Sequence, residues 1–259
     1  MQEGYWVIRT IKAGQVGEKT KFWVPGKRPE KSGRRTRSEI KKQEQNDYAC
    51  VKTLARRINA NFHPGDLLMG LDYNADGYRK VLERAEKMDA DGTADEVQKM
   101  EYIRLAAEAE LRNALKRVKR ELQKEGKELP YIAITSDMDG DTGESVRVHH
   151  HLLVPKWAKK IFLDKWEKFG MGGVSWTPLR EQEDYLPIAE YFMNQVRRVP
   201  DAKKYIPSRN LIRPVPKDRI AISDAELLPP RGGKLLFRAA YKPGQPQYIR
   251  YILPVKRRE

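Results

Sequence analysis

Hydrophobic residues recur along the chain at spacings that predict a series of extended segments. Short alternating or uniformly apolar runs, bounded by glycine, proline and polar turn residues, are typical of β-strands. These runs span residues 5–12, 20–24, 66–73, 130–136, 145–154, 173–179, 234–241 and 247–254. Gly14 and Gly17 between the first two runs, and the polar stretch 137–143 between the fourth and fifth, predict two β-hairpins.

Other parts of the chain have apolar residues every three or four positions, the period of a helix with one buried face. Leu111, Leu115, Val118 and Leu122 give the clearest case, within a long helix predicted for residues 93–124 that ends before Gly126. The other predicted helices span residues 43–60, 76–89, 156–168 and 184–198. Helices mixed with antiparallel hairpins favour the α+β class.

The charge of the chain predicts a kind of binding partner. Its 259 residues include 51 Lys and Arg against 36 Asp and Glu, a formal net charge of +15. Proteins this basic usually contact a polyanion, most often nucleic acid. Residues 27–42 hold eight Lys or Arg and two Glu, which predicts a basic arm that could be a solvated linker, lie along phosphates, or do both.

Cysteine content and hydropathy exclude several classes of protein. Cys50 is the single cysteine, so this chain can form neither an internal disulfide nor a zinc site built on several thiolates. No apolar run approaches the ~18 residues of a membrane span, and the first residues lack the basic and apolar parts of a signal peptide. We therefore expect a cytoplasmic protein with no membrane partner.

Three consecutive histidines lie within the predicted strand 145–154. Alternate side chains of a strand share a face, so His149 and His151 project together, while His150 projects with the apolar Val148 and Leu152. Two imidazoles on one face are well placed to bind one divalent ion, although a structural cluster or a chance run would have the same sequence. His150 is predicted to pack in the core and to hydrogen-bond a backbone carbonyl.

The histidine segment resembles the His-hydrophobic-His motif of the HUH endonucleases. More narrowly, the chain is similar to the rolling-circle replication-associated proteins of bacterial plasmids, integrative elements and small phages. Residues 61–73 resemble the first strand motif of that family, residues 188–193 its nucleophile helix, and residues 208–214 a segment common after that helix. The matching segments read Arg147-Val148-His149-His150-His151-Leu152-Leu153-Val154, Ile188-Ala189-Glu190-Tyr191-Phe192-Met193 and Ser208-Arg209-Asn210-Leu211-Ile212-Arg213-Pro214, and the first strand motif ends in Leu71-Asp72-Tyr73.

The sequence departs from the family pattern at three places. His150 occupies a slot that is usually hydrophobic, Asp72 replaces a usual threonine, and Asn194 and Gln195 stand where a lysine often follows the nucleophile. The resemblance implies a ferredoxin-like HUH endonuclease core with a central antiparallel sheet over residues 61–216. It leaves residues 1–60 as an N-terminal hairpin, basic arm and helix, and residues 217–259 as a C-terminal strand extension.

The resemblance also implies an enzyme that nicks and joins single-stranded DNA to initiate rolling-circle replication. Cutting a strand while keeping the energy of the phosphodiester needs a covalent intermediate, which a tyrosine can provide as a 5′-phosphotyrosine. In the predicted helix 184–198, Tyr185 falls within the apolar stripe, whereas Tyr191 lies about 120° away on a polar face. We therefore predict Tyr191 as the nucleophile, Tyr185 as the alternative, and Gln195 and Arg198 as further catalytic residues.

Two histidines rarely complete a site for Mg²⁺ or Mn²⁺, so a third protein ligand is expected. Asp137 is the predicted ligand, with Asp72 and Asp139 as alternatives, although acidic residues before a glycine turn often only stabilise the turn. Mn²⁺ suits mixed imidazole and carboxylate ligands better than the abundant Mg²⁺, and the prediction includes both ions. The metal would polarise the scissile phosphate and offset the charge of the transition state.

Basic and amide side chains of the arm and around these motifs are the predicted DNA contacts. They are Arg34, Arg35, Arg37, Arg147, Arg197, Lys204, Arg209 and Asn210. The implied partners are single-stranded or hairpin origin DNA and the host replication machinery, a helicase and a polymerase, because the chain has no P-loop motif of its own.

Two alternatives to a replication initiator stay open. Relaxases and transposases use the same chemistry, although relaxases more often place the tyrosine before the histidines. A sequence-specific DNA-binding protein without catalysis is the alternative from another class. Metal-dependent cleavage with a covalent adduct would distinguish the enzymes from the binding protein.

Overall fold

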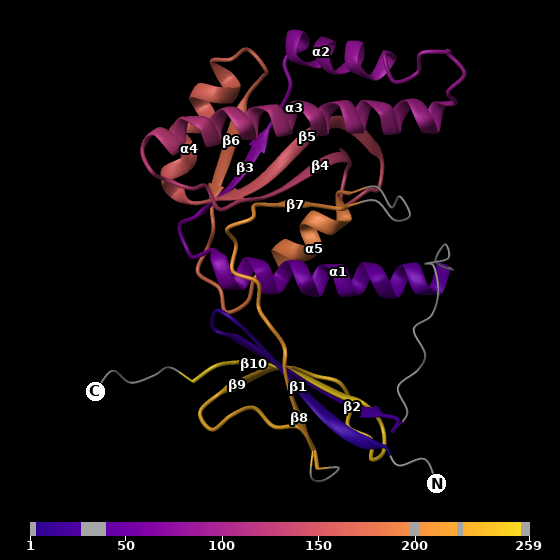
Figure 1. Ribbon diagram of the computed structural model, residues 1–259, viewed down its shortest axis with the longest axis vertical. Coiled ribbons are helices and arrows are strands. Elements are labelled where there is room, and N and C mark those ends of the chain that lie inside the picture. Colours follow the sequence, from indigo (N-terminus) through magenta and orange to yellow (C-terminus); the bar gives the residue numbers. More distant parts are fainter. Residues whose placement is uncertain (1–3, 27–39, 197–202, 222–224, 255–259) are drawn as a thin grey trace. The chain divides into compact units, whose positions relative to one another are not determined.

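A computed structural model describes residues 4–26, 40–196, 203–221 and 225–254 (Figure 1). The chain folds as two compact units. Unit 1 contains residues 1–61, 183–186 and 212–259, and unit 2 contains residues 62–182 and 187–211. Each unit holds one five-stranded antiparallel sheet, and five α-helices accompany the two sheets in the described residues. The mixture of helices and antiparallel strands confirms the predicted α+β class.

Unit 1 is built on a sheet with the strand order β8-β1-β2-β10-β9 (Figure 1). Strands β1 (Tyr5–Ala13) and β2 (Val16–Val24) form the predicted hairpin. Gly14 in its turn has a φ of +59°, and a side chain there would collide with the backbone carbonyl of Asn59, so only glycine fits. The unit is completed by helix α1 (Ile40–Asn61) and by β8 (Lys217–Ile220), β9 (Lys234–Arg238) and β10 (Gln247–Ile252).

The two ends of the chain share this sheet, which the sequence patterns did not reveal. Lys21 of β2 pairs with Gln247 of β10, and Val7 of β1 pairs with Ile220 of β8. The sequence divides the chain into the consecutive segments 1–60, 61–216 and 217–259. In the structure, strands of the first and third segments belong to one unit, because they pair with each other.

Unit 2 is built on a sheet with the strand order β6-β3-β5-β4-β7. Its strands are β3 (Leu67–Leu71), β4 (Ile132–Met138), β5 (Ser145–Val154), β6 (Val174–Pro178) and the short β7 (Ile206–Pro207). Helices α2 (Ala75–Glu86), α3 (Glu96–Lys124) and α4 (Lys159–Phe162) lie on one side of the sheet, and α5 (Leu186–Asn194) lies on the other (Figure 1). Strand β5 is therefore the middle strand, with helices on both sides.

Helix α3 shows how the sequence pattern becomes the core of unit 2. Asp95 and Gln98 form a reciprocal capping box that satisfies backbone N–H groups at the start of the helix. The predicted stripe is buried against the sheet, with Leu111 and Val118 at its centre. Gly126, with a φ of +65°, follows the end of the helix. None of the helices in the described residues is both long and apolar enough to cross a membrane.

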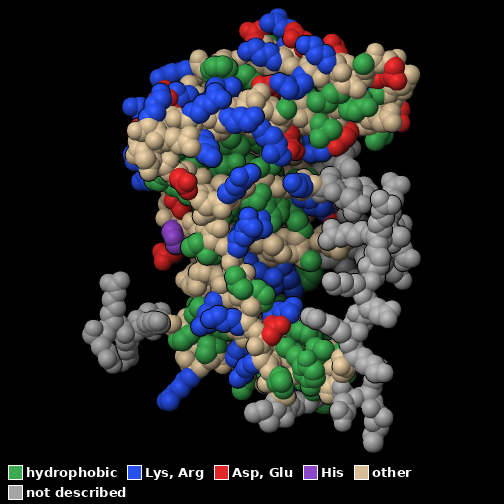
Figure 2. Space-filling model, viewed as in Figure 1, with side chains coloured by type: hydrophobic (Ala, Val, Ile, Leu, Met, Phe, Trp, Pro, Cys, Tyr) green, Lys and Arg blue, Asp and Glu red, His purple; other side chains and the backbone are tan. Residues whose placement is uncertain are grey.

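Charge is divided unequally between the two units. Over the full sequence, unit 1 contains 26 of the 51 Lys and Arg and only 12 of the 36 Asp and Glu, a net charge of +14 out of +15. Unit 2 contains the other 25 basic and 24 acidic residues, a net charge of +1. In Figure 2, acidic and basic side chains are interspersed over the helices of unit 2, whereas few acidic side chains accompany the basic ones over the strands of unit 1. The excess positive charge therefore belongs to unit 1.

Candidate metal and tyrosine site

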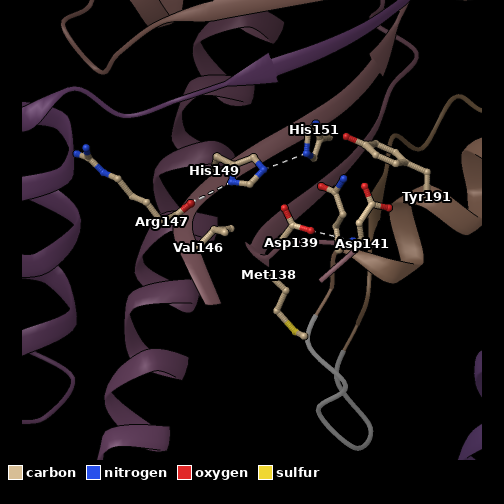
Figure 3. A pocket seen from close by; sticks show the side chains of 10 residues that line it. Met138, Asp139, Asp141, Val146, Arg147, His149, His151 and Tyr191 are labelled. Atoms are coloured by element: carbon tan, nitrogen blue, oxygen red, sulfur yellow. Dashed lines mark hydrogen bonds between the residues drawn. The ribbon is translucent and has the colours of Figure 1, made fainter. Parts of the chain in front are cut away.

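The three histidines lie on β5, the middle strand of the unit 2 sheet. Strand alternation turns His150 into the core, where it is fully buried beneath α3. His149 and His151 project from the opposite face, the face that carries α5, and Figure 3 shows them side by side near Tyr191. The imidazoles of His149 and His151 thus lie on one face of the sheet, and the imidazole of His150 lies in the core on the other face.

His149 and His151 are arranged like two ligands of one metal ion. Their Nε2 atoms face each other at 3.0 Å. His149 Nδ1–H donates to the carbonyl oxygen of Arg147 at 3.0 Å, which leaves the Nε2 lone pair directed at His151. A backbone carbonyl behind a histidine is the usual device that fixes the orientation of a metal ligand. An octahedral ion with ligands at ~2.1 Å holds neighbouring ligand atoms about 3.0 Å apart, so the spacing fits a shared ion.

Burial keeps two of the imidazoles neutral. Burial lowers the pKa of His151 to about 4. The neighbouring His149 lowers this pKa further, and the nearby Gln195 side chain partly offsets the lowering. Burial, followed by the charges of His149 and His151, lowers the pKa of His150 to about 3. At pH 7 the His151 ring is therefore neutral, and a neutral imidazole is the form that binds metal.

His150 holds β5 in place from the core side of the sheet. Its Nε2 lies 2.7 Å from the hydroxyl oxygen of Tyr73, and its Nδ1 lies 3.0 Å from the hydroxyl oxygen of Thr135. The Tyr73 hydroxyl also donates to the carbonyl of Ala107 at 3.2 Å. A ring protonated on Nε2 satisfies all three groups, since Nε2–H donates to Tyr73 and Thr135 donates to Nδ1. The predicted backbone carbonyl partner is wrong, because Thr135 pairs directly with His150 and supplies a hydroxyl instead.

Helix α5 brings Tyr191 to the histidine pair. The ring centroids of Tyr191 and His151 are 5.5 Å apart, and Figure 3 shows the Tyr191 hydroxyl directed toward His151. Tyr191 is 42% exposed, whereas Ala189 and Phe192 on the same helix are buried. A pocket of about 430 Å³ is lined by His149, His151, Tyr191 and Gln195 among others. The helix therefore buries its apolar stripe and leaves Tyr191 accessible beside the histidines.

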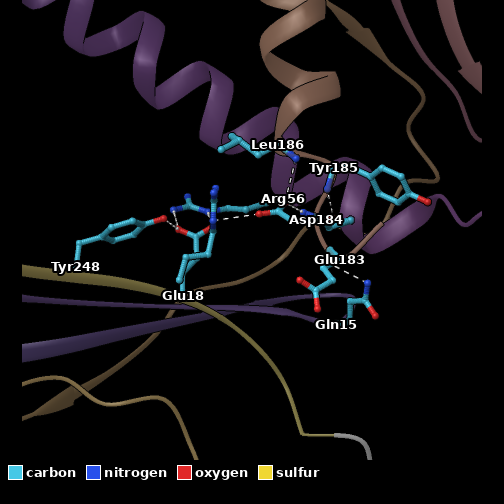
Figure 4. Close-up of polar contacts among 10 residues, drawn as sticks. Gln15, Glu18, Arg56, Glu183, Asp184, Tyr185, Leu186 and Tyr248 are labelled. Atoms are coloured by element: carbon cyan, nitrogen blue, oxygen red, sulfur yellow. Dashed lines mark hydrogen bonds and ion pairs between the residues drawn. The ribbon is translucent and has the colours of Figure 1, made fainter. Parts of the chain in front are cut away.

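Tyr185, the alternative nucleophile, lies just before α5 and is only 4% exposed. Its backbone N–H donates to the side-chain oxygen of Asn59 at 3.0 Å, and Asn59 donates in turn to the carboxylate of Asp184 at 2.9 Å. Figure 4 shows Tyr185 beside Asp184 in this polar cluster. Tyr185 belongs to unit 1 and does not line the pocket of the histidines.

Gln195 directly follows α5 and is anchored to β4. Its backbone carbonyl accepts a hydrogen bond from the Ser136 hydroxyl at 2.9 Å, and Ser136 pairs with His149 across the sheet. Gln195 is 7% exposed and lines the pocket, yet its buried Oε1 accepts no well-formed hydrogen bond from the residues that the structure describes. A buried acceptor without a donor costs free energy, and an amide oxygen is a suitable ligand for a hard cation. The donor set of His149, His151 and Gln195 therefore fits a divalent metal.

The acidic candidates lie in three different places. Asp137 is buried in an irregular part of β4 and interacts with Arg104 of α3, whose pKa is raised mainly by Glu101 and also by Asp137. Neither Asp137 nor the exposed Asp72 lines the pocket. In the part of the chain that the structure describes, no group of three or more His, Cys, Asp or Glu side chains is placed to hold a metal. The structure therefore does not bring Asp137 or Asp72 to the histidine pair.

Asp139 is the acidic candidate that lines the pocket. Its Oδ1 accepts hydrogen bonds from the backbone N–H groups of Thr142 and Asp141, both at 2.9 Å, and these hold the pKa of the Asp139 carboxyl below its usual range. The carboxylate is thus ionised at neutral pH and stabilises the turn between β4 and β5. Figure 3 shows Asp139 on the same side of the pocket as Asp141.

Arg147 is the predicted DNA contact that the structure places at the pocket. Its guanidinium lies 4.3 Å from the centroid of the Tyr78 ring and donates to the carbonyl of Asn74 at 3.1 Å. These contacts fix an exposed guanidinium against the start of α2, and Figure 3 shows the Arg147 side chain extending away from His149 at the edge of the pocket.

Of the other predicted DNA contacts, the three that the structure describes do not line this pocket. Arg209 and Asn210 are exposed in a turn, where Asn210 accepts a hydrogen bond from the Ser208 hydroxyl at 2.6 Å, and Lys204 is half-buried. Arg34, Arg35, Arg37, Arg197 and the predicted catalytic Arg198 lie outside the described residues.

Gly70 is a site residue that the sequence analysis missed. It pairs with His151 on one side and with Ser175 of β6 on the other, so it lies beside His151 on the pocket face. A Cβ at Gly70 would lie 2.5 Å from the Ser175 hydroxyl oxygen, which is too close. Glycine therefore leaves no side chain at this position beside His151. A glycine within an apolar strand often marks such a close approach, and this was the available signal.

Comparison of the chain with family models, curated protein sequences and solved structures found no match. The capability of the site therefore follows from its own chemistry. Two converging imidazoles, a buried amide oxygen, a fixed guanidinium and an accessible phenol surround one pocket. Such a set can bind a divalent cation and a phosphate, and it can present a nucleophile to that phosphate.

Proposed function

We propose that the protein is a metal-dependent, site-specific DNA-nicking and joining enzyme that initiates rolling-circle replication. The proposal includes a ferredoxin-like HUH endonuclease core in unit 2, as the sequence motifs imply. The observation that carries it is the pocket shared by His149, His151 and Tyr191. A tyrosine beside a histidine pair at metal-ligand spacing is the combination that phosphodiester transfer needs.

In the proposed reaction, the phenol oxygen of Tyr191 attacks the phosphorus of one phosphodiester. The phenol loses its proton as the new oxygen–phosphorus bond forms, and the bond to the 3′-oxygen breaks. That oxygen takes up a proton and leaves as a 3′-hydroxyl, while the 5′ side of the DNA stays on Tyr191. Attack by a 3′-hydroxyl on this ester reverses the step, so joining needs no ATP. The exposure of Tyr191 supports the proposal, because a large polymer must reach it.

His149 and His151 would hold the divalent ion, with Gln195 or Asp139 as a further ligand. Mixed imidazole and oxygen ligands favour Mn²⁺ and allow Mg²⁺. The bound ion would polarise the phosphate and offset the charge that builds up on it. Arg147 would bind a phosphate oxygen at the rim of the pocket, because its stacking on Tyr78 already fixes the guanidinium. The proposed partners are single-stranded or hairpin origin DNA and a host helicase and polymerase in the bacterial cytoplasm.

The two tyrosines provide a matched test of this function. Wild-type protein, Tyr191→Phe and Tyr185→Phe would be incubated with single-stranded oligonucleotides that tile the replicon carrying the gene, with Mn²⁺ or with EDTA. We expect an SDS-resistant protein–DNA adduct from the wild type with Mn²⁺ only. Tyr185→Phe should retain the adduct, and Tyr191→Phe should lose it while still binding DNA.

Mapping the adduct by mass spectrometry identifies the nucleophile directly. A phosphotyrosine at residue 191 supports the proposal. An adduct that persists in Tyr191→Phe, or one that maps to Tyr185, would exclude Tyr191 as the nucleophile. DNA binding by the wild type without cleavage under all metal conditions would instead identify a non-catalytic DNA-binding protein.

A further inference from the structure

A hollow of about 320 Å³ lies on one face of the unit 1 sheet, where β8, β1 and β2 pair. Val7 pairs with Phe22 on one side and with Ile220 on the other, so one row across three strands forms its floor. Tyr5 lies at its edge and is 45% exposed, and Ile220 is 67% exposed. Figure 2 shows hydrophobic side chains gathered over the strands of unit 1 with Lys and Arg beside them. The proposed nicking reaction uses none of these residues.

Arg9 adds a fixed cation to this hollow. Its guanidinium carbon lies 5.1 Å from the centroid of the Phe22 ring, and two of its nitrogens donate to the Asp218 carboxylate at 2.9 and 2.8 Å. The remaining N–H groups of a guanidinium held in this way can bind a base edge or a phosphate oxygen. Lys217 and Arg219 are exposed on the adjacent edge strand β8. The hollow therefore combines aromatic faces with an excess of basic groups.

We propose that this hollow is a second nucleic-acid site, which binds a single strand by stacking a base on Tyr5, beside the Arg9–Phe22 pair, while its phosphates contact the surrounding Lys and Arg. The charge of unit 1 supports a polyanionic ligand, since this unit carries +14 of the net charge of +15. Aromatic side chains that stack bases within a positively charged groove are how proteins bind single strands without reading their sequence.

A single strand fits the hollow better than a duplex does. Base faces are exposed in a single strand, whereas in a duplex they are covered by neighbouring base pairs. Duplex recognition usually places a helix or a ribbon in a groove, whereas this surface is a shallow hollow in the face of a sheet. The ligand is thus single-stranded DNA or RNA of any sequence, and the site acts by holding the strand rather than by cutting it.

The test measures binding of a fluorescent oligothymidylate by anisotropy, with EDTA present so that no metal-dependent step takes part. Tyr5→Ala should raise the dissociation constant about 5- to 150-fold, the range for the loss of one base–aromatic stack. Tyr5→Trp should restore binding, because it restores a larger aromatic face. The matched control is Trp157→Ala, which removes an aromatic side chain of similar exposure, 50%, from unit 2 and should leave binding unchanged.

Three results would overturn the inference. They are an unchanged affinity of Tyr5→Ala, an equal loss in Trp157→Ala, and an equal loss on a duplex of the same length. Circular dichroism of Tyr5→Ala shows that a loss of binding is not a loss of folding, and Tyr5→Trp tests the same point. The outcome is separable from the nicking proposal. Nicking without Tyr5-dependent binding would refute this site alone, and Tyr5-dependent binding without nicking would refute the enzyme alone.

Discussion

His149 is oriented by its own strand. Its Nδ1–H bonds to the carbonyl of Arg147, two residues earlier, so the direction of the Nε2 lone pair depends only on the local backbone of β5. His151 gains its position from the same strand and from burial against α5, where Phe192 lies close to its ring. The pair therefore needs little from the rest of the fold beyond a regular strand.

A metal-binding prediction follows for these two side chains. His149→Ala and His151→Ala should each weaken Mn²⁺ binding more than about tenfold, because even residues that only support a metal ligand have effects of this size. Electron paramagnetic resonance of free Mn²⁺, titrated with metal-depleted protein, measures the affinity. The control is His63→Ala, which removes the one histidine outside the cluster and should bind Mn²⁺ like the wild type. Equal affinities for all three variants would contradict a metal site at this pair.

Single residues of the site differed in how well the sequence predicted them. Strand alternation was enough to join His149 with His151 and to turn His150 away, because it depends only on local backbone geometry. The place of Asp137 depends on the register between β4 and β5. Ser136 pairs with His149, so the residue after Ser136 falls on the other face, and no local pattern reveals that pairing.

At the scale of elements, the site depends on the junction between α5 and β4. The Ser136 hydroxyl oxygen lies 2.9 Å from the carbonyl oxygen of Gln195 and 3.0 Å from that of Met138, and its one hydrogen is shared between these two acceptors. The bond to Gln195 anchors the C-terminal end of α5, the helix that carries Tyr191, to β4. Strand β4 pairs in turn with β5, which carries the histidines. The tyrosine and the histidines are therefore positioned relative to each other through one buried hydroxyl group.

Removing that hydroxyl should affect catalysis more than stability. Ser136→Ala should lower the free energy of unfolding by about 1 kcal/mol, the usual value for one hydrogen bond. It should slow nicking about 10- to 100-fold at saturating Mn²⁺, since a small displacement of a nucleophile has effects of this size. Thr53→Ala is the control, because it removes a comparable hydroxyl-to-carbonyl bond within α1, to Ala49. Equal nicking rates for both variants would show that the junction does not position Tyr191.

A partly buried ion pair joins three elements of unit 1 (Figure 4). The carboxylate of Glu18 on β2 accepts hydrogen bonds from Arg56 of α1 at 2.9 and 2.7 Å and from the Tyr248 hydroxyl of β10 at 2.9 Å. Burial alone would raise the pKa of Glu18, but Arg56 and Tyr248 outweigh it, so the pKa of this carboxyl lies below its usual range. The charged form of Glu18 is thus the stable form in the folded protein.

The stability of unit 1 should therefore fall in acid. A carboxyl with a lowered pKa in the folded state stabilises it above the unfolded pKa of about 4.3, and the contribution is lost as the pH falls through the lower folded pKa. Glu18→Gln should cost about 3 kcal/mol at pH 7, because it leaves the Arg56 charge without its partner. Urea unfolding from pH 7 downward measures the difference from the wild type. That difference should shrink below about pH 4, and a difference that stays constant with pH would contradict the assignment.

The periodic elements were predictable from sequence, and the short ones were not. Strands β1 to β6, strands β9 and β10, and the five helices match predicted segments, because each carries its own apolar pattern. Strands β7 and β8 were missed. β8 reads Lys-Asp-Arg-Ile with every residue exposed, and it is extended because β1 supplies its hydrogen-bond partners. Tertiary pairing, and not local preference, creates this element.

At the scale of the whole molecule, the division of charge was not readable from the sequence. Unit 1 is assembled from three separate stretches of the chain, so its net charge of +14 cannot be counted until the pairing of its strands is known. Unit 2 is nearly balanced, at +1. The net charge of unit 2 therefore gives no general attraction for an anion, and Arg147 is a basic side chain that lines its pocket.

The pairing of β2 with β10 has a consequence for how the protein is made. A ribosome synthesises β2 early and β10 late, with all of unit 2 between them. At about 5–20 residues per second, the hairpin of β1 and β2 waits roughly 10–50 s for the strand that covers its edge. During that time β2 presents an open edge to other nascent chains, and lysines such as Lys19 and Lys21 discourage intermolecular pairing. Lys21 becomes buried only later, when its ammonium donates to the carbonyl of Ala225.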